Sequence, residues 1–275
     1  MTILELVLIS IGFFFGLGAT AWLTVRYDLR KPNFRGERIP SIAGLAFVLA
    51  GDFIYGFEWL AGGPASRVFA AYFLVLIGFG ILGMYDDLAG DRSVGGFRGH
   101  FRALAQGRLT TGAVKALGGG AVALGAGWLM GNGDLWRFAL AAALIALSAN
   151  SLNLLDLRPG RCLFVFFCSA AVLTAVLANV HQMNVGFALF IAVGMAAVIY
   201  PMDAAGQAMI GDTGSNSFGA VLGVAASAIL PLAWQAVVVV LLIGFQFWCE
   251  RNSLSKTIDA NPFLRGLDRK IGVRR

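Results

Sequence analysis

The stretch GMYDD, residues 83–87, closes an apolar run from Val68 to Met84 that contains no charged residue. An uncharged run of about this length is a candidate for a transmembrane helix. Two adjacent aspartates therefore fall where such a helix meets water. The carbonyl end of a helix carries partial negative charge, which disfavours carboxylates there. We therefore expect Asp86 and Asp87 to have a compensating partner, and a metal ion is the leading candidate.

Two interpretations of this aspartate pair are open. Mg²⁺ typically binds one or two carboxylates together with phosphate oxygens of a substrate and keeps several waters. The functional interpretation is therefore that Asp86, Asp87 or both bind Mg²⁺ or position a phosphate. The plainer interpretation is a solvated helix end.

The composition is typical of a membrane protein. The sequence of 275 residues is 58% hydrophobic and 13% charged, with a mean hydropathy of +0.77, whereas a soluble domain carries roughly 25% charged residues. We predict an all-α, polytopic membrane helix bundle over residues 1–249, followed by a basic amphipathic tail over residues 250–275. The three cysteines have no metal-ligand spacing, so we expect them to be small buried hydrophobes.

Nine stretches have nearly the length and composition of a membrane span. They run approximately over Ile3–Val25, Ile39–Trp59, Val68–Met84, Gly112–Met130, Arg137–Leu152, Cys162–Val180, Val185–Met202, Asn216–Leu230 and Leu232–Trp248. The first resembles a signal peptide in hydrophobicity but lacks a basic start, so we interpret it as a span.

Lysine and arginine predict the orientation of these spans. Of the 21 Lys and Arg residues, all but Arg67 and Arg137 fall on the side that carries the loops after the odd-numbered spans. The positive-inside rule places that side in the cytoplasm, with the N-terminus outside and the C-terminus inside. The net charge of +6 indicates contact with anionic lipid, and no aromatic–basic pattern for nucleic acid accompanies it. We therefore expect a plasma-membrane protein without a nucleic-acid partner.

The same orientation brings acidic residues to the predicted cytoplasmic face. These are Asp86, Asp87, Asp91, Asp156, Asp203 and Asp212. Helix ends from the third, fifth and seventh spans could converge there on one site. An acid inside the second span, Asp52, points toward the outer half and has no evident role.

The segment GDTGS, residues 211–215, opens the eighth span. Asp212 suits an N-cap, because its side chain can accept bonds from free backbone N–H groups. The same turn resembles an anion-binding helix start, at which free N–H groups face a phosphate. Both interpretations stay open.

Three polar residues at the end of the fifth span are spaced so that they share one helix face. Asn150, Asn153 and Asp156 follow i, i+3, i+6 spacing. Hydrogen bonding between helices is the plainer interpretation, and recognition of a polar headgroup or nucleoside is the functional one.

Basic residues near these motifs are candidates for phosphate contact. Arg158 and Arg161 flank a Pro-Gly turn and are either a phosphate clamp or interfacial anchors. Lys115 lies one turn inside its span, where it either snorkels to the surface or meets an anion within the bundle. Arg38, just before the second span, is a further substrate-binding candidate. His100 is a candidate for contact with phosphate or lipid.

Several of these motifs occur together, in order and on one predicted face. In this the sequence resembles the polyprenyl-phosphate N-acetylhexosamine-1-phosphate transferases, which are integral membrane enzymes. The similar segments are PSIAG at 40–44 against a Pro-Thr-x-Gly-Gly pattern, the aspartate pair 86–87, Lys115, the N-x-x-N-x-x-D pattern at 150–156 and GDTGS at 211–215. The resemblance extends from about Arg38 to Gly223.

The resemblance implies transfer of a sugar-1-phosphate from a UDP-sugar to a polyprenyl phosphate, with release of UMP, in the synthesis of cell-envelope glycans. It makes Asp212 the main Mg²⁺ ligand and places Asp86 and Asp87 beside the metal and phosphates. Lys115 would contact phosphate. The nucleotide side of the cleft would be faced by Asn153 and Asp156.

The sequence also departs from the family pattern. The family usually has ten spans and a His-rich motif in its last cytoplasmic loop, whereas we expect nine spans here and find no histidine in Glu250–Arg275. The segment LRPGR, residues 157–161, replaces the second half of an Asp-Gly-x-Asp-Gly pattern. The alternative function is therefore a non-catalytic homologue that binds lipid phosphate or a partner protein. A homodimer stays open in either case.

Overall fold

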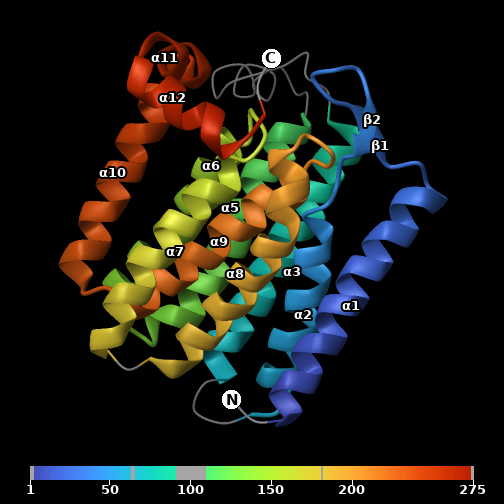
Figure 1. The fold of residues 1–275 in the computed structure, drawn as a ribbon. Coiled ribbons are helices and arrows are strands. Elements are labelled where there is room, and N and C mark those ends of the chain that lie inside the picture. Colours follow the sequence, from blue (N-terminus) through green and yellow to red (C-terminus); the bar gives the residue numbers. More distant parts are fainter. Residues whose placement is uncertain (1–2, 63–65, 91–109, 181, 274–275) are drawn as a thin grey trace.

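The computed structural model describes residues 3–62, 66–90, 110–180 and 182–273. These residues form helices and one short hairpin, drawn in Figure 1. The elements are α1 (Ile3–Arg26), β1 (Arg30–Pro32), β2 (Arg38–Pro40), α2 (Leu45–Leu60), α3 (Ser66–Ala89), α5 (Thr111–Gly131), α6 (Leu135–Leu155), α7 (Arg161–Val180), α8 (Met183–Ala204), α9 (Gly211–Ile229), α10 (Leu232–Arg251), α11 (Leu254–Ala260) and α12 (Pro262–Ile271).

Seven helices within the described ranges are long and apolar enough to cross a membrane. They are α1, α3, α5, α6, α7, α8 and α10. The prediction of an all-α polytopic membrane bundle is confirmed to this extent. The remaining two candidates are α2, which has 16 residues, and α9, which has 19. Nine spans and their orientation therefore stay predictions.

The second predicted span begins later than expected, because a hairpin occupies its first residues. β1 and β2 pair antiparallel, with Lys31 opposite Ile39. Pro40 has no backbone N–H to donate and disfavours a helix at the residue before it. Gly36, between the strands, has a φ of +81°, which glycine adopts without strain. The helix α2 consequently starts at Leu45 rather than at Ile39.

The helix α9 runs through the centre of the bundle (Figure 1). Of its 19 residues, 15 are buried, and it packs against α3, α6 and α7. The approach of α6 depends on glycine, because a Cβ on Gly223 would lie 2.5 Å from the Cα of Ile145. Phe218 of α9 stacks on Phe47 of α2, with ring centroids 4.1 Å apart. Small residues that let helices approach closely are typical of packing in membranes.

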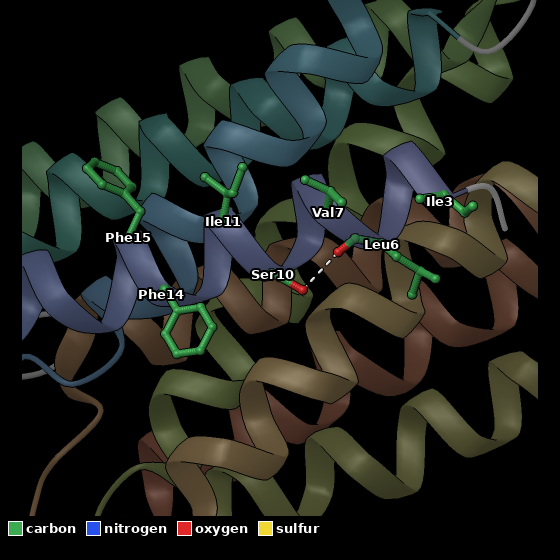
Figure 2. Close-up of a pocket in the computed structure, with 7 residues that line it drawn as sticks. All are labelled: Ile3, Leu6, Val7, Ser10, Ile11, Phe14 and Phe15. Atoms are coloured by element: carbon green, nitrogen blue, oxygen red, sulfur yellow. Dashed lines mark hydrogen bonds between the residues drawn. The ribbon is translucent and has the colours of Figure 1, made fainter.

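The helix α1 packs on α2 through one face and exposes apolar side chains on the rest. The packed face consists of four residues spaced four apart, Gly12, Gly16, Thr20 and Thr24. A hollow of about 670 Å³ lies on the exposed side. Figure 2 shows the residues that line it, which are Ile3, Leu6, Val7, Ser10, Ile11, Phe14 and Phe15. The Ser10 hydroxyl donates to the Leu6 carbonyl oxygen over 2.9 Å. The lining is therefore apolar, and we assign the hollow to the surface that lipid chains contact.

The helices α11 and α12 follow α10 and lie at the same end of the molecule as the hairpin (Figure 1). We call residues 254–273 the tail. Phe263 and Arg269 are exposed on α12, whereas Asp268 is buried against the bundle. An acidic residue thus belongs to the inward face of the tail, and its amphipathic character stays a prediction.

Candidate active site

Four helix ends meet at the end of the bundle that carries the hairpin and the tail (Figure 1). They are the last turns of α3 and α6 and the first turns of α5 and α9. Hydrogen bonds join Asp87 to Thr213, Lys115 to Asp212 and Asn153 to Ser215 across these ends. Segments far apart in the sequence are therefore brought together here, and the ends of the third and fifth predicted spans, α3 and α6, are among them. We call this region the acidic end.

Lys115 lies between two carboxylates at the acidic end. Its Nζ forms an ion pair with Oδ2 of Asp212 and lies 3.7 Å from Oδ2 of Asp86. It also donates to Oδ1 of Asn153 over 3.4 Å. Of the two interpretations of Lys115, the structure therefore supports contact with anionic groups within the bundle. One lysine therefore lies between two acidic side chains, from α3 and from α9.

Asp87 has surroundings quite unlike those of its neighbour Asp86. Its Oδ1 accepts from the backbone N–H of Asp212 over 2.9 Å, and its Oδ2 accepts from the backbone N–H and the hydroxyl of Thr213 over 2.9 and 2.6 Å. These N–H groups belong to the first turn of α9 and have no partner within the helix. Asp87 therefore caps α9 from another helix, where its negative charge also suits the helix dipole.

The cap on α9 requires glycine at its entry. Gly211 has a φ of +67°, and a Cβ there would lie 2.6 Å from Oδ2 of Asp87. The N-cap interpretation of Asp212 is not what the structure has, because Ile210 is the N-cap residue and its side chain makes no capping bond. The Asp212 carboxylate instead faces Lys115 and does not cap α9, so it could also contact a metal ion or a substrate.

The segment PSIAG, residues 40–44, holds the other side of the α9 start. The backbone N–H groups of Ala43 and Gly44 donate to the carbonyl oxygens of Met209 and Ile210 over 2.9 and 3.1 Å. A Cβ on Gly214 would lie 2.7 Å from the Cα of Gly44. Two motifs that the sequence analysis singled out thus contact each other through glycine backbones.

The two asparagines of α6 diverge, although their spacing suggested a shared face. Asn153 donates from Nδ2 to the hydroxyl of Ser215 over 3.0 Å. Asn150 donates from Nδ2 to Oε1 of Gln246 on α10 over 3.0 Å. Asn150 therefore makes the plainer contact between helices, and Asn153 alone of the two belongs to the acidic end.

A cavity of about 490 Å³ opens beside the acidic end. Its ionisable lining residues are Lys31, Asp87, Asp156, Arg158, Asp203 and Asp212. The turn after α6 contributes Asp156 and Arg158, and Asp203 lies near the end of α8. The Asp203 carboxylate accepts from the backbone N–H of Gly160 over 2.9 Å. Acidic and basic groups thus share one cavity that is large enough for part of a polar ligand.

Asp156 has an altered acidity in this cavity. Burial raises the pKa of its carboxyl well above the ordinary value, and the negative charges of Asp203, Asp212 and Asp87 raise it further. These effects favour the protonated, neutral acid. Asp156 can therefore donate a hydrogen bond to a ligand as well as accept one.

Lys31 lies in this cavity, although its sequence pattern did not single it out. Its Nζ donates to the backbone carbonyl of Asp87 at the end of α3. Its place in β1 turns it inward, since Arg30 and Pro32 are exposed and Lys31 is half-buried.

Other predicted residues lie apart from the cavity. Arg38 is exposed and pairs with Asp28 over 2.9 Å. Arg161 is buried and pairs with Asp268 of the tail. The predictions for Asp91 and His100 fall outside the described residues.

The carboxylates of Asp86 and Asp212 fit Mg²⁺ better than Asp87 does. No group of three or more His, Cys, Asp or Glu side chains within the described residues is arranged to hold a metal ion. Mg²⁺, however, commonly uses one or two carboxylates and completes its shell with water and phosphate oxygens. Asp86 and Asp212 offer such a pair around Lys115, whereas both oxygens of Asp87 are already engaged.

Comparison with known proteins adds no identification, because no protein-family model and no curated protein matches the sequence.

Proposed function

We propose that the protein transfers a sugar-1-phosphate, N-acetylhexosamine-1-phosphate being the leading case, from a UDP-sugar to a polyprenyl phosphate. The observation that supports this most is the cluster of Asp86, Lys115 and Asp212, of which Asp212 also lines the cavity. Two carboxylates and one amine at the edge of a polar cavity suit a ligand that brings both phosphate and a divalent cation. The cluster lies at the ends of apolar helices, where the phosphate of a membrane lipid is within reach.

The reaction makes modest chemical demands on the protein. A phosphate monoester has a second pKa of about 6, so the lipid phosphate is already largely dianionic at neutral pH and needs no strong general base. Its oxygen attacks the phosphorus nearest the sugar and forms a new P–O bond. The diphosphate bond to UMP breaks, and UMP leaves with the electron pair. The protein must therefore align the two phosphates and neutralise their charge.

The residues at the acidic end match these demands. Lys115 supplies a cation beside Asp212, and Lys31 and Arg158 supply two more in the cavity. Mg²⁺, which Asp86 and Asp212 would hold, supplies further neutralisation of the diphosphate when bound. Asp156, as a neutral acid, donates a hydrogen bond to a polar group of the nucleotide sugar. Asp87 has a positioning role, because it fixes the start of the helix that carries Asp212.

The proposal is tested with purified protein, undecaprenyl phosphate, Mg²⁺ and a panel of UDP-sugars, by measuring UMP. We expect release with at least one UDP-sugar and a loss of about a thousandfold in Asp212→Asn. Asp28→Asn, which removes an exposed acid of a surface ion pair, should retain the parent rate. No release with any UDP-sugar would rule out the transferase.

The alternative of a non-catalytic homologue has one observation in its favour. Lys115 already compensates part of the charge of Asp86 and Asp212, so these carboxylates have a partner within the protein besides any cation from solution. Thermal stabilisation by a UDP-sugar without any UMP release would support this alternative over transfer.

A further inference from the structure

The tail is held on the bundle by a buried ion pair. Arg161, the first residue of α7, donates from Nε to Oδ1 of Asp268 over 2.5 Å and from Nη2 to Oδ2 over 3.0 Å. The two side chains are 3% and 6% exposed. The third nitrogen, Nη1, donates to the hydroxyl of Ser255 on α11 over 3.0 Å. One guanidinium therefore binds both tail helices, and loss of its carboxylate would leave a buried charge without its partner.

From Ile271, the last residue of α12, the chain follows the rim of the cavity. The Tyr200 hydroxyl donates to the carbonyl oxygen of Ile271 over 2.8 Å, and the backbone N–H of Val273 donates to the carbonyl oxygen of Ala204 over 2.8 Å. Gly160 has a φ of +82°, and a Cβ there would collide with the Ile271 carbonyl. The path of the tail is therefore fixed by α8 and by the turn before α7.

Val273 brings the tail into the cavity itself. Its side chain lines the same space as Asp156 and Asp212. Its Cγ2 lies 3.2 Å from the point that a Cβ on Gly206 would occupy. The side chain of Val273 is apolar, in contrast to the ionisable groups of the lining. Docking of the tail thus completes one wall of the cavity.

We propose that the docked tail is a permanent wall of the substrate cavity and that Val273 is a positioning residue that sets the cavity's width. The ion pair between Arg161 and Asp268 holds this wall in place. The identity of the substrate as a UDP-sugar rests on the proposed function, but the wall itself does not. The tail thereby belongs to the site, although it contributes no reacting group.

The wall is tested by the labelling of a cysteine in the cavity. Ala208 lines the cavity and is 2% exposed, so Ala208→Cys is the probe, in a background with Cys168→Ala and Cys249→Ala. The buried Cys162 stays in place as a monitor of unfolding. A charged, membrane-impermeant thiol reagent is added, and the labelling rate is measured. Asp268→Asn should raise the rate of the probe by about tenfold or more.

A matched control separates docking from tail charge. Asp259→Asn makes the same charge change at an exposed tail residue and should leave the labelling rate unchanged. Equal rates in the Asp268→Asn and Asp259→Asn variants would overturn the proposal.

Labelling of Cys162 would show that Asp268→Asn unfolds the protein. A second variant, which leaves the ion pair intact, tests the proposal in that case. Val273→Trp fills the cavity from the tail side and should slow labelling of the probe by about tenfold. An unchanged rate would overturn the proposal.

The same variant also gives a functional readout. Val273→Trp should raise the KM for the UDP-sugar more than it lowers kcat, as expected for a residue that shapes the binding space. Absence of turnover in every variant would contradict the proposed function and leave the labelling result intact, so the two failures are distinguishable.

Discussion

The consecutive helices α9 and α10 are nearly equal in length but differ in polarity and in burial. α9 begins with a polar run, residues 211–217, and buries 15 of its 19 residues. α10 is long and apolar enough to span a membrane, yet Gln235 is its single buried residue. In a soluble protein the more apolar helix would be expected inside. Here the polar helix is inside, and the apolar helix faces outward.

The difference follows from the solvent that each helix meets. Lipid chains are as apolar as leucine, so an apolar surface gains little by leaving them. Polar groups within the hydrocarbon layer must instead find partners in the protein. The polar start of α9 has such partners in Asp87, Asn153 and Lys115. The start of α9 is therefore buried because its polar groups find hydrogen-bond and charged partners in the protein. The geometry of the acidic end depends on this burial.

The largest effect is expected from one glycine in each helix. A Cβ on Gly223 of α9 would lie 2.5 Å from the Cα of Ile145, whereas a Cβ on Gly244 of α10 would meet nothing within 4 Å. Gly223→Ala should therefore push α6 away and destabilise the protein by about 2–3 kcal/mol. Gly244→Ala should be neutral or stabilise it by up to about 1 kcal/mol. Thermal unfolding in detergent measures both, and equal effects would contradict the packing contrast.

A smaller effect is expected at the start of α9, where two neighbouring aspartates differ in role. Asp87→Asn replaces an acceptor oxygen by a donor that faces the N–H groups of Asp212 or Thr213, so we expect a loss of about 2 kcal/mol. Asp86→Asn removes no hydrogen bond to the backbone of α9 and should change the free energy of unfolding by less than about 1 kcal/mol.

The same detergent unfolding assay compares the two asparagine variants. If Asp86→Asn is the more destabilising of the pair, the assignment of Asp87 as the cap of α9 is wrong.

Much of the architecture could be predicted from long apolar stretches alone, because nine were expected and each overlaps a described helix, although the helix of the second begins only at Leu45. The sequence could not show which of Asp86 and Asp87 caps α9 and which faces Lys115, since adjacent residues on a helix differ only in the direction in which their side chains point. Direction depends on the docking of α9, which is a tertiary property. The divergence of Asn150 and Asn153 has the same origin, because residues three apart lie nearly one turn apart along a helix, and which neighbour each meets depends on how α9 and α10 pack on α6.

The tail and the hairpin were the least predictable parts of the acidic end. A basic, amphipathic segment indicates a membrane surface, and nothing in its local pattern shows that Asp268 meets Arg161. That pair joins residues 107 positions apart. Lys31 was missed for a related reason, because only the pairing of β1 with β2 directs it toward α3.

The smallest effect is expected at Asp156, an acidic residue of the cavity beside the start of α9. Asp156 has a raised pKa in the folded protein through burial and neighbouring carboxylates, whereas the unfolded chain has an ordinary value of about 3.9. The folded state therefore binds the proton of Asp156 more tightly than the unfolded state does. At a pH above the ordinary pKa the carboxyl destabilises the folded protein, and this destabilisation grows as the pH rises toward the pKa of the folded state.

Asp156→Asn removes this destabilisation. We expect it to raise the Tm by a few degrees at neutral pH and by progressively less as the pH falls to about 4, while Asp259→Asn, at an exposed position, shows no such trend. A difference in Tm that is independent of pH would mean that the burial of Asp156, rather than its charge, determines its effect on stability.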